Sequence, residues 1–464
     1  MRRQVRNLRY IFRPKSVAIV GASGSPSKVG AVVLKNLMEG NFGGDIYPIN
    51  PKYDELAGLK CYPAVTSVRK KIDCAIVATP AKFVPKILKQ CGKKKIKGVV
   101  VLSGGFSEVG NVELEKKLKE TADRYDIAVI GPNCLGILNP YKRVDSIFLP
   151  MYKLKRPRPG GISFVTQSGA TGTCVVDLAA KYGVGIAKFI SYGNGTVIDE
   201  NDLLEFLEED EKTEEILLYL EGTKNGKRLL EVMERVNRKK PVVVLKAGRG
   251  EKASQAAFSH TGNLAGNYLA YDAAFRQAKV VVANSLDELF EFVKIFNQAL
   301  PKGKRIGIVT NGGGLGVLTT DVIEENQLEL AEFSKDTVKK LKKILPSYAN
   351  ASNPLDVIAD ADSELYRKAL DIIKDSREVD IIAVIVLFQA PAVDERILNI
   401  LINISDLKKK PVVVIAVGGE YTEGHREILE SYGVPTYSSP SDAIKAVKKL
   451  VDYSYAARRT GEKK

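Results

Sequence analysis

The segment V-A-I-V-G-A-S-G-S-P-S-K-V-G, residues 17–30, decides the fold class at the N-terminal end of the chain. A short apolar run leads into a glycine-rich turn, and a helical pattern follows. Residues 162–172 (I-S-F-V-T-Q-S-G-A-T-G) and 306–316 (I-G-I-V-T-N-G-G-G-L-G) repeat this arrangement. Such turns expose backbone N–H groups at a helix N-terminus, where the helix dipole favours anions. One turn is a weak signal, because α/β folds also use glycine there for packing. Three indicate a protein that handles several phosphate groups.

Strand-like apolar runs alternate with helical patterns along the whole chain, which is typical of βαβ units and parallel sheets. With 464 residues the chain is too long for one ordinary core. We expect three α/β domains, at residues 1–140, 161–300 and 301–464. A basic, Pro-rich stretch at residues 141–160 is interpreted as a linker.

Composition excludes several classes of protein. The net charge is +15, but no basic stripe with interleaved aromatics occurs, so we expect no nucleic-acid partner. No apolar run is long enough to span a bilayer, and we expect a cytoplasmic protein without membrane contact. Residues 1–14 are Arg-rich; we interpret them as a short basic helix packed on the first domain rather than as a transit peptide. The five cysteines lack a C-x-x-C pair and there are two histidines, so neither disulfides nor a metal site is expected.

The first turn resembles a dinucleotide fingerprint, but the residues after the second strand differ from an NAD site. NAD sites usually place an acidic residue there for the ribose hydroxyls. This chain has Asn50 and Lys52, with Asp54 and Glu55 slightly further on. A cation suits an extra phosphate, which leaves NADP, coenzyme A or a turn without ligand as alternatives. No G-x-x-x-x-G-K-[ST] motif occurs, so a nucleotide phosphoryl site is expected on another chain.

Two further residues are candidates for chemistry. His260 lies in a small, polar, glycine-bearing stretch, A-A-F-S-H-T-G-N-L-A-G, and most histidines in such loops are ordinary surface residues. An imidazole acts as a nucleophile when a carboxylate holds its other nitrogen. Glu221 follows the apolar run 216–220, and functional groups in parallel sheets gather at strand carboxyl ends. A solvated carboxylate is the alternative for Glu221. Ser168 is not in a G-x-S-x-G elbow, so a serine hydrolase is not favoured.

Taken in order, nine short motifs resemble a known family. The chain resembles the α subunit of ADP-forming acetyl-CoA (acyl-CoA) synthetases, within the succinyl-CoA synthetase superfamily, from about Pro14 onward. Each motif is weak alone, and their order and spacing are specific. The motifs are V-A-I-V-G-A-S, I-Y-P-I-N-P-K, S-G-G-F-S-E, I-G-P-N-C-L-G, T-Q-S-G-A, S-Y-G-N-G, L-Y-L-E-G, S-H-T-G-N-L-A-G and T-N-G-G-G-L-G.

The resemblance implies a fold and a reaction. An N-terminal Rossmann-like CoA-binding domain would precede two flavodoxin-like parallel-sheet domains. Acyl-CoA and inorganic phosphate would give acyl phosphate and CoA, and the acyl phosphate would then phosphorylate His260. An ATP-grasp β subunit, expected in an α₂β₂ assembly, would bind Mg²⁺ and ADP and make ATP. No ATP-grasp segment is recognised in this chain.

The resemblance also implies residue roles. His260 would carry the phosphoryl group, and Glu221 would orient its imidazole. Residues at the second and third glycine turns would bind phosphate: Gln167, Ser168, Gly169, Gly312, Gly313 and Gly314. Residues at the strand ends of the first domain would bind coenzyme A: Gly21, Ser23, Gly24, Lys28, Asn50, Lys52, Pro80, Ser103, Gly104, Gly105 and Asn133.

Four alternatives stay open at the level of sequence. A ligase with another acyl specificity would share every motif. A non-catalytic CoA-binding regulatory protein would not need His260. An NADP-dependent oxidoreductase would use the first turn but leave the other two unexplained. A CoA-dependent protein acetyltransferase would need an appended domain that is not recognised here.

Overall fold

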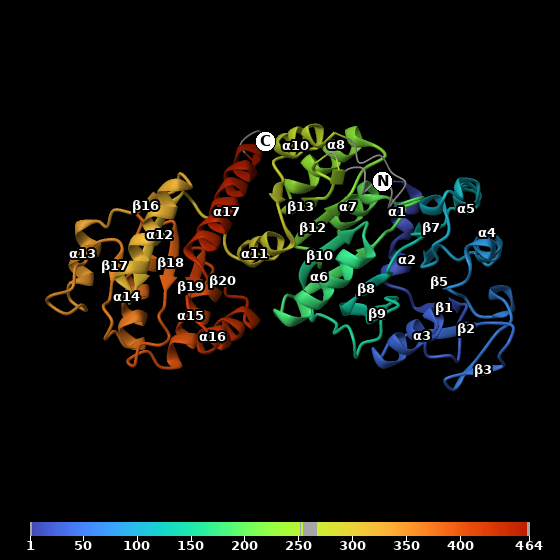
Figure 1. The fold of residues 1–464 in the computed structure, drawn as a ribbon, viewed down its shortest axis with the longest axis horizontal. Helices are drawn as coiled ribbons and strands as arrows, with labels where there is room; N and C mark the ends of the chain where they lie inside the picture. The colour runs from blue at the N-terminus through green and yellow to red at the C-terminus, as the bar shows by residue number, and fades with distance from the viewer. Residues whose placement is uncertain (1, 251, 254–266, 462–464) are drawn as a thin grey trace. The chain divides into compact units, whose positions relative to one another are not determined.

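The computed structural model describes residues 2–250, 252–253 and 267–461. They form two compact units, residues 1–284 and residues 285–464 (Figure 1). His260, the predicted phosphoryl carrier, lies outside the described residues. In the part of the chain that is described, no helix is long and apolar enough to cross a membrane.

The first unit contains two sheets, and the N-terminal one is a five-stranded parallel sheet in the order β2-β1-β5-β6-β7. Its inner strands are buried along their whole length, as expected for a parallel sheet covered on both faces. The strands are β1 (Ser16–Val20), β2 (Asp45–Ile49), β5 (Cys74–Val77), β6 (Gly98–Val101) and β7 (Ala128–Ile130), with a separate hairpin of β3 (Glu55–Leu56) and β4 (Leu59–Lys60). The helices are α1 (Arg3–Asn7), α2 (Arg9–Phe12), α3 (Val29–Glu39), α4 (Val84–Lys93) and α5 (Val112–Tyr125), with one-turn helices η1 (Val65–Ser67), η2 (Ala81–Phe83) and η3 (Ser107–Val109).

The second sheet of this unit has seven strands in the order β14-β13-β12-β10-β11-β8-β9. Five of them are parallel, and β8 and β9 extend the edge beside β11 as antiparallel strands. The strands are β8 (Ile137–Asn139), β9 (Val144–Asp145), β10 (Pro159–Thr166), β11 (Ile186–Ser191), β12 (Glu215–Leu220), β13 (Val242–Lys246) and β14 (Val281–Ala283). The helices are η4 (Pro140–Lys142), α6 (Gly169–Lys181), α7 (Glu200–Glu208), α8 (Gly226–Asn237) and α10 (Tyr268–Ala278).

The second unit has one parallel sheet in the order β16-β15-β18-β19-β20, with β17 also paired to β15. The strands are β15 (Arg305–Thr310), β16 (Glu329–Leu330), β17 (Leu355–Asp356), β18 (Ile381–Ile385), β19 (Val412–Ile415) and β20 (Thr436–Tyr437). The helices are α11 (Leu286–Phe296), α12 (Gly313–Glu325), α13 (Lys335–Leu341), α14 (Ser363–Asp375), α15 (Arg396–Asp406), α16 (Glu420–Ser431) and α17 (Pro440–Gly461).

All three parallel sheets follow one strand order. Without the antiparallel strands β8 and β9 and the short strand β17, each sheet places its second strand on one side of the first and its third strand on the other, in the order 2-1-3-4-5. The side of the sheet on which new strands are added therefore reverses between the second and third strands of every sheet. Ligands of doubly wound folds bind in the crevice at this switch point, outside the carboxyl ends of the strands. The fold thus provides three equivalent crevices, and each of the three glycine turns follows the first strand of a sheet.

The basic N-terminal stretch and the stretch 141–160 are both folded. The basic N-terminal stretch forms α1 and α2, whose side chains Val5, Leu8, Ile11 and Phe12 are fully buried, so the predicted packed helix is confirmed. The stretch 141–160, interpreted as a linker, is folded: it contains β9 and the start of β10, and Arg156 donates to the buried Asp145 at 2.7 Å. The ion pair ties this basic stretch to the edge of the second sheet.

Candidate active site

The second crevice brings together two of the predicted site regions, the turn Gln167–Gly169 after β10 and Glu221 after β12. Strands β10 and β12 are neighbours in the sheet, and Thr166 lies opposite Tyr219 in the register. Gln167 joins the two strand ends directly. Its Oε1 accepts hydrogen bonds from the backbone N–H groups of Glu221 and Gly222 at 2.5 and 3.0 Å, and its Nε2 donates to the carbonyl of Gly222 at 2.9 Å.

Residues 221–223, here called the strand-end turn, are held by side chains from four elements. Besides Gln167, Lys246 at the end of β13 donates to the Glu221 carbonyl at 2.7 Å. The Thr223 N–H donates to the hydroxyl of Tyr271 on α10 at 3.0 Å, and Thr223 Oγ1 donates to Glu200 on α7 at 2.5 Å. A turn whose backbone groups are fixed in this way gives the side chain of Glu221 a preset position.

The carboxylate of Glu221 lies in a protected, polar setting. The residue is 7 % exposed. Tyr219, two residues earlier on the same face of β12, hydrogen-bonds to it; burial first, and then the Glu221 charge, raise the pKa of the Tyr219 hydroxyl. Burial also lowers the pKa of Lys246 to about 8, while the Glu221 charge acts in the opposite direction. The Lys246 ammonium donates to the carbonyls of Glu221 and Ala247, so a buried titratable group holds the backbone that carries this carboxylate.

The predicted phosphate turn forms the N-terminus of α6 in this crevice. Ser168 is the N-cap residue, and its Oγ accepts from the Thr171 N–H at 3.2 Å. Thr166 Oγ1 accepts from the Ser168 N–H at 3.1 Å. Gly169 lies against Leu135, because a Cβ added there would stand 3.6 Å from the Leu135 Cβ. The predicted phosphate turn therefore opens a true helix of 13 residues, as the dipole argument requires.

The third crevice, in the second unit, repeats this construction. Asn311 takes the place of Gln167: its Oδ1 accepts from the Leu387 N–H at 2.8 Å, and its Nδ2 donates to the Leu387 carbonyl at 3.3 Å. Thr310 Oγ1 accepts from the Gly312 N–H at 2.9 Å, as Thr166 does for Ser168. Gly312 is the N-cap of α12, and Gly313 and Gly314 form its first turn. A Cβ at Gly313 would lie 2.5 Å from Asp356 Oδ2, so the Asp356 carboxylate would have to move to admit a side chain.

The first crevice collects the residues predicted for coenzyme A. Gly21, with φ of +91°, ends β1, and its N–H donates to the Ile49 carbonyl at 2.9 Å. Asn50 follows β2; its Nδ2 donates to the Ala22 carbonyl at 2.7 Å and its Oδ1 accepts from the Lys52 N–H at 3.0 Å. The remaining predicted residues follow the ends of the same sheet: Ser23, Gly24 and Lys28 after β1, Pro80 after β5, Ser103, Gly104 and Gly105 after β6, and Asn133 after β7.

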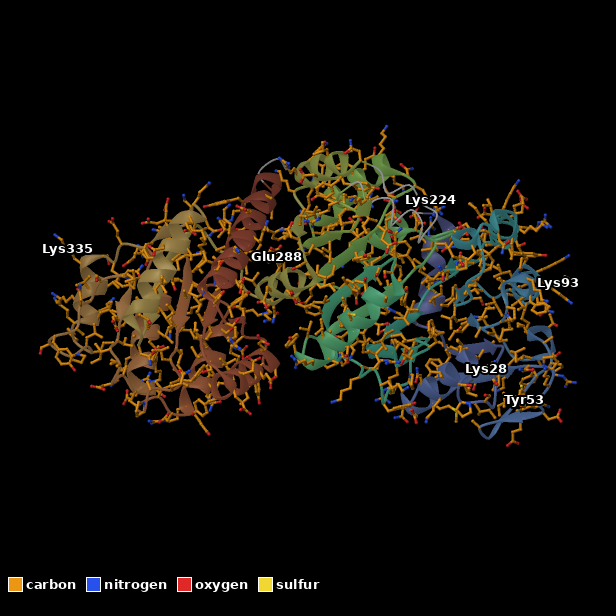
Figure 2. All side chains as sticks on the ribbon, viewed as in Figure 1. Lys28, Tyr53, Lys93, Lys224, Glu288 and Lys335 are labelled. Carbon is orange, nitrogen blue, oxygen red and sulfur yellow. The ribbon has the colours of Figure 1, made fainter. Side chains whose placement is uncertain are left out.

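Lysines mark this crevice with positive charge. Lys28 is the N-cap residue of α3 (Figure 2), and Lys52 lies in the turn after β2. Both side chains are exposed, and within the described residues neither forms an ion pair with a carboxylate. Two uncompensated cations beside a helix N-terminus provide a setting for a phosphate-bearing ligand.

Several polar groups of the turn after β6 already form hydrogen bonds within the protein. Ser103 Oγ donates to the Thr79 carbonyl at 2.5 Å, and the Gly105 N–H donates to Glu108 Oε1 at 2.5 Å. Asn194, from the motif S-Y-G-N-G, donates to Glu108 Oε2 at 2.7 Å and accepts from Asn133 Nδ2 at 3.3 Å. Three motifs that are far apart in the sequence thus meet where the two sheets of the first unit adjoin. The Ser103 hydroxyl and the Gly105 N–H are used within the protein, and their role in binding coenzyme A stays a prediction.

Sequence reasoning missed Lys246, Tyr271, Glu200 and Asn194 as site residues. The motif L-K-A-G-R carried a usable signal, because a lysine at the end of an apolar strand lies at the same sheet edge as Glu221. Glu200 carried none, since the acidic run I-D-E-N-D reads as an ordinary helix start.

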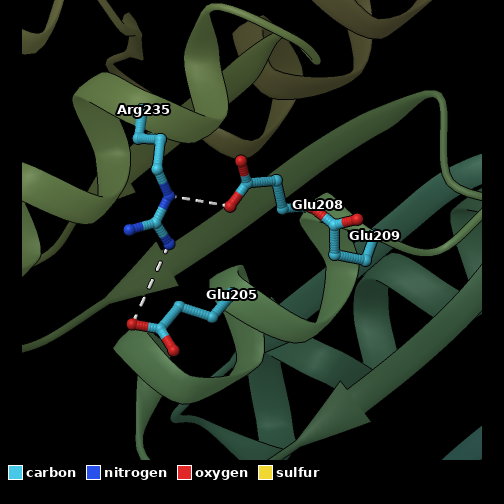
Figure 3. A pocket seen from close by; sticks show the side chains of 4 residues that line it. All are labelled: Glu205, Glu208, Glu209 and Arg235. Carbon is cyan, nitrogen blue, oxygen red and sulfur yellow. Dashed lines mark hydrogen bonds and ion pairs between the residues drawn. The ribbon is translucent and has the colours of Figure 1, made fainter. Parts of the chain in front are cut away.

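An acidic pocket between α7 and α8 is a second candidate for a functional site. It has a volume of about 380 Å³ and is lined by Glu205, Glu208 and Glu209 of α7 and Arg235 of α8 (Figure 3). Arg235 Nε donates to Glu208 at 2.8 Å, and Lys239 pairs with the same carboxylate at 2.7 Å. Burial opposes ionisation of Glu208, but these two cations outweigh it and lower its pKa. The charges compensate one another, so the pocket is a surface ion-pair network rather than a reaction site.

Family models and relatives agree with this architecture. A CoA-binding domain model matches residues 15–140, a succinyl-CoA-ligase-like flavodoxin domain model matches residues 159–296, and a ligase-CoA domain model matches residues 306–460. The solved structure of Ca. Korarchaeum cryptofilum dinucleotide-forming acetyl-coenzyme A synthetase 1, in complex with phosphate and ADP, is 35% identical and covers 98% of each chain with a TM-score of 0.92. The three-domain α/β fold predicted from the sequence, with a CoA-binding domain followed by two flavodoxin-like domains, is confirmed. Its exact boundaries stay a prediction.

Curated relatives define the class more closely. The α subunit of acetate–CoA ligase [ADP-forming] II from Pyrococcus furiosus is 40% identical over 96% of this chain and 97% of its own length. The acetate–CoA ligase [ADP-forming] of Methanocaldococcus jannaschii is 43% identical over 96% of this chain, which spans 63% of that longer protein. Fold and site therefore define a CoA-binding protein of the succinyl-CoA-ligase-like class. Within that class, the chain belongs to the family of α subunits of ADP-forming acetate–CoA ligases.

Proposed function

We propose that this chain is the α subunit of an acid–CoA ligase that forms acyl-CoA, with acetate as the first substrate to test, and that His260 carries the phosphoryl group. The observation that carries the proposal is Glu221, a buried carboxylate beside the N-terminus of α6, whose backbone is fixed by Gln167 and Lys246. Such a carboxylate suits the orientation of an imidazole nucleophile. The sequence places His260 in the segment that follows β13, the strand beside β12.

The reaction consists of an acyl transfer to phosphate followed by a phosphoryl transfer to His260. In the first, an oxygen of inorganic phosphate attacks the acyl carbon of acyl-CoA, the C–S bond breaks, and the CoA thiolate leaves. In the second, an imidazole nitrogen of His260 attacks the phosphorus of acyl phosphate, the P–O bond breaks, and the carboxylate leaves. Glu221 holds the proton on the other imidazole nitrogen. The backbone N–H groups at the start of α6 stabilise the phosphate oxygens.

The proposal assigns the remaining chemistry to a partner. The phosphoryl group on His260 passes to ADP, with Mg²⁺, on an ATP-grasp β subunit, and the assembly is α₂β₂. Two observations support a partner: the P. furiosus relative is named as an α subunit, and the M. jannaschii relative extends well beyond this chain. Lys28, Asn50 and Lys52 hold the phosphates of CoA. The turns that begin α6 and α12, at Gly169 and Gly313, bind phosphate oxygens.

The test is phosphorylation of the chain itself. The purified protein, alone and with its co-purifying partner, is incubated with ³²P-labelled acetyl phosphate, quenched in base and digested. We expect an acid-labile, base-stable phosphate on the peptide that contains His260, and release of that label by ADP when the β subunit is present. Absence of label even with the partner would contradict the proposal and favour a regulatory CoA-binding protein.

The assignment of the CoA site predicts the effect of removing one lysine. Lys52→Ala should raise the KM for CoA about fivefold in acetyl-CoA formation from acetyl phosphate, because one exposed charge–phosphate contact is lost. Labelling by acetyl phosphate without CoA should be unchanged. Lys35→Ala is the matched control, since Lys35 lies on α3 and pairs with Glu39 at 3.5 Å. Equal KM values for the two variants would contradict the predicted role of Lys52.

A further inference from the structure

Glu200 is a buried carboxyl group that the reaction scheme does not use. It is the first residue of α7 and is 3 % exposed. The preceding residue, Asp199, caps the helix by accepting from the Asp202 N–H at 3.0 Å, so Glu200 is held at the helix N-terminus by an independent contact. A glutamate with this burial needs partners, because an uncompensated buried carboxylate is costly.

The main partner of Glu200 belongs to the strand-end turn. Thr223 Oγ1 accepts from the Asn225 N–H at 3.2 Å, so its own proton is directed to Glu200 Oε1, at 2.5 Å. Asn201 Nδ2 donates to the same carboxyl oxygen at 3.2 Å. Of the side chains that hold the turn, Gln167 and Tyr271 keep one charge state near neutral pH. Glu200 is the carboxyl group, and Lys246, whose pKa burial lowers to about 8, is the second group that titrates in this range.

From these contacts we propose that Glu200 is a positioning residue for Glu221, acting through Thr223 on the turn that carries the catalytic carboxylate. The inference rests on the proposed function. The ionised carboxylate accepts the Thr223 proton in a charge-assisted hydrogen bond, which is stronger than the bond to a neutral carboxyl group. Ionisation of Glu200 therefore holds the strand-end turn more firmly and favours phosphoryl transfer.

The surroundings place this ionisation near neutral pH. Burial, and then the charge of Asp199, raise the pKa of Glu200 to about 7. Below this pKa Glu200 is neutral and its hydrogen bond to Thr223 is weaker. Above this pKa Glu200 is ionised and the hydrogen bond is stronger. Three titratable groups act on Glu200 directly: Asp199, the N-cap residue of α7, Tyr192 after β11 and Tyr271 on α10. Around them, Asp202 of α7 pairs with Arg228 of α8, Lys224 donates to the Asn194 carbonyl, and Lys246 of β13 acts on Glu221.

The test follows the rate of His260 phosphorylation by acetyl phosphate between pH 6 and pH 9 in the full-length chain. Glu200→Gln keeps an acceptor for Thr223 but cannot ionise. We expect its rate to equal that of the wild type at pH 6 and to be about fivefold lower at pH 8. A fivefold difference is what we expect from the loss of one charge-assisted hydrogen bond. The inflection that the wild type shows near pH 7 should be missing.

Two further variants separate positioning from other effects. Thr223→Val removes the connecting hydroxyl while leaving Glu200 free to titrate, so it should also lose the inflection. Glu215→Gln is the matched control: Glu215 is 5 % exposed, burial raises its pKa well above the ordinary value, and it lies at the opposite end of β12. Its profile should follow that of the wild type.

Three outcomes overturn the inference. If Glu200→Gln and the wild type have the same profile, Glu200 does not act on the reaction. If Thr223→Val keeps the inflection, the effect of Glu200 is electrostatic and does not pass through the turn. If the wild type is not labelled at all, the proposed function falls and this role falls with it, whereas the first two outcomes leave the labelled His260, and with it the function, in place.

Discussion

Glu221→Gln is expected to slow phosphorylation of the chain by acetyl phosphate at least 100-fold, by analogy with other carboxylates that orient a catalytic imidazole. The amide matches the carboxylate in volume, so the fold should be kept. The backbone of residue 221 is held by Gln167 and Lys246 rather than by its own side chain. What is lost is a negative acceptor for the imidazole proton, and that charge matters most when the ring becomes positive during attack on phosphorus. The measurement is the single-turnover rate of label incorporation at saturating acetyl phosphate.

A control variant and a stability measurement separate a catalytic role of Glu221 from a structural one. Glu215→Gln changes a buried carboxyl group on the same strand and should leave the rate within about a factor of two, because substitutions far from a site add independently. Thermal unfolding of Glu221→Gln should match that of the wild type. A variant that is stable and keeps more than a third of the rate would show that Glu221 is only a buried strand-end carboxylate.

The glycine turns could be predicted because their signal is local. A strand, a turn and a helix start follow one another in the chain, and residues 162–166 and 306–310 form the ends of β10 and β15 as expected. Glu221 could be predicted for the same reason, since its position after an apolar run places it at the strand carboxyl end. The two-residue strands β16, β17 and β20 could not, because such a short run has no periodicity.

The support of the site depends on contacts between distant residues. Glu200 lies 23 positions before Thr223, and Tyr271 lies 48 positions after it. A charged residue at a helix start or a strand end is normally solvated. The sequence therefore places Lys246 at the sheet edge but does not show that Lys246 or Glu200 is buried. The shared strand order of the three sheets is likewise a pairing of distant segments. The order explains why Gln167 and Asn311 have the same task, since each bridges the first and third strands of its own sheet.

The other large effect concerns the first turn. Gly30→Ala is expected to destabilise the N-terminal part of the chain by about 3 kcal/mol or more, at the upper end of overpacking substitutions. Gly30 lies in the first turn of α3, where a Cβ would stand 2.0 Å from the carbonyl oxygen of Gly21 and 2.8 Å from its carbonyl carbon. Both neighbours are backbone atoms, so no side chain can turn away. Helix α3 would have to move off β1, and the turn between them would change shape.

Because that turn is the predicted CoA site, Gly30→Ala should also weaken CoA binding more than tenfold, a loss of about 1.4 kcal/mol. Calorimetric CoA titration and thermal unfolding of the full chain are the measurements. Gly424→Ala is the control: Gly424 lies within α16, and a Cβ there would meet nothing within 4 Å. Alanine is the better helix former by about 0.8–1 kcal/mol, so this variant should be as stable as the wild type or more so. If Gly30→Ala is as stable as Gly424→Ala, helix propensity decides the outcome at position 30 and the contact with Gly21 does not limit it.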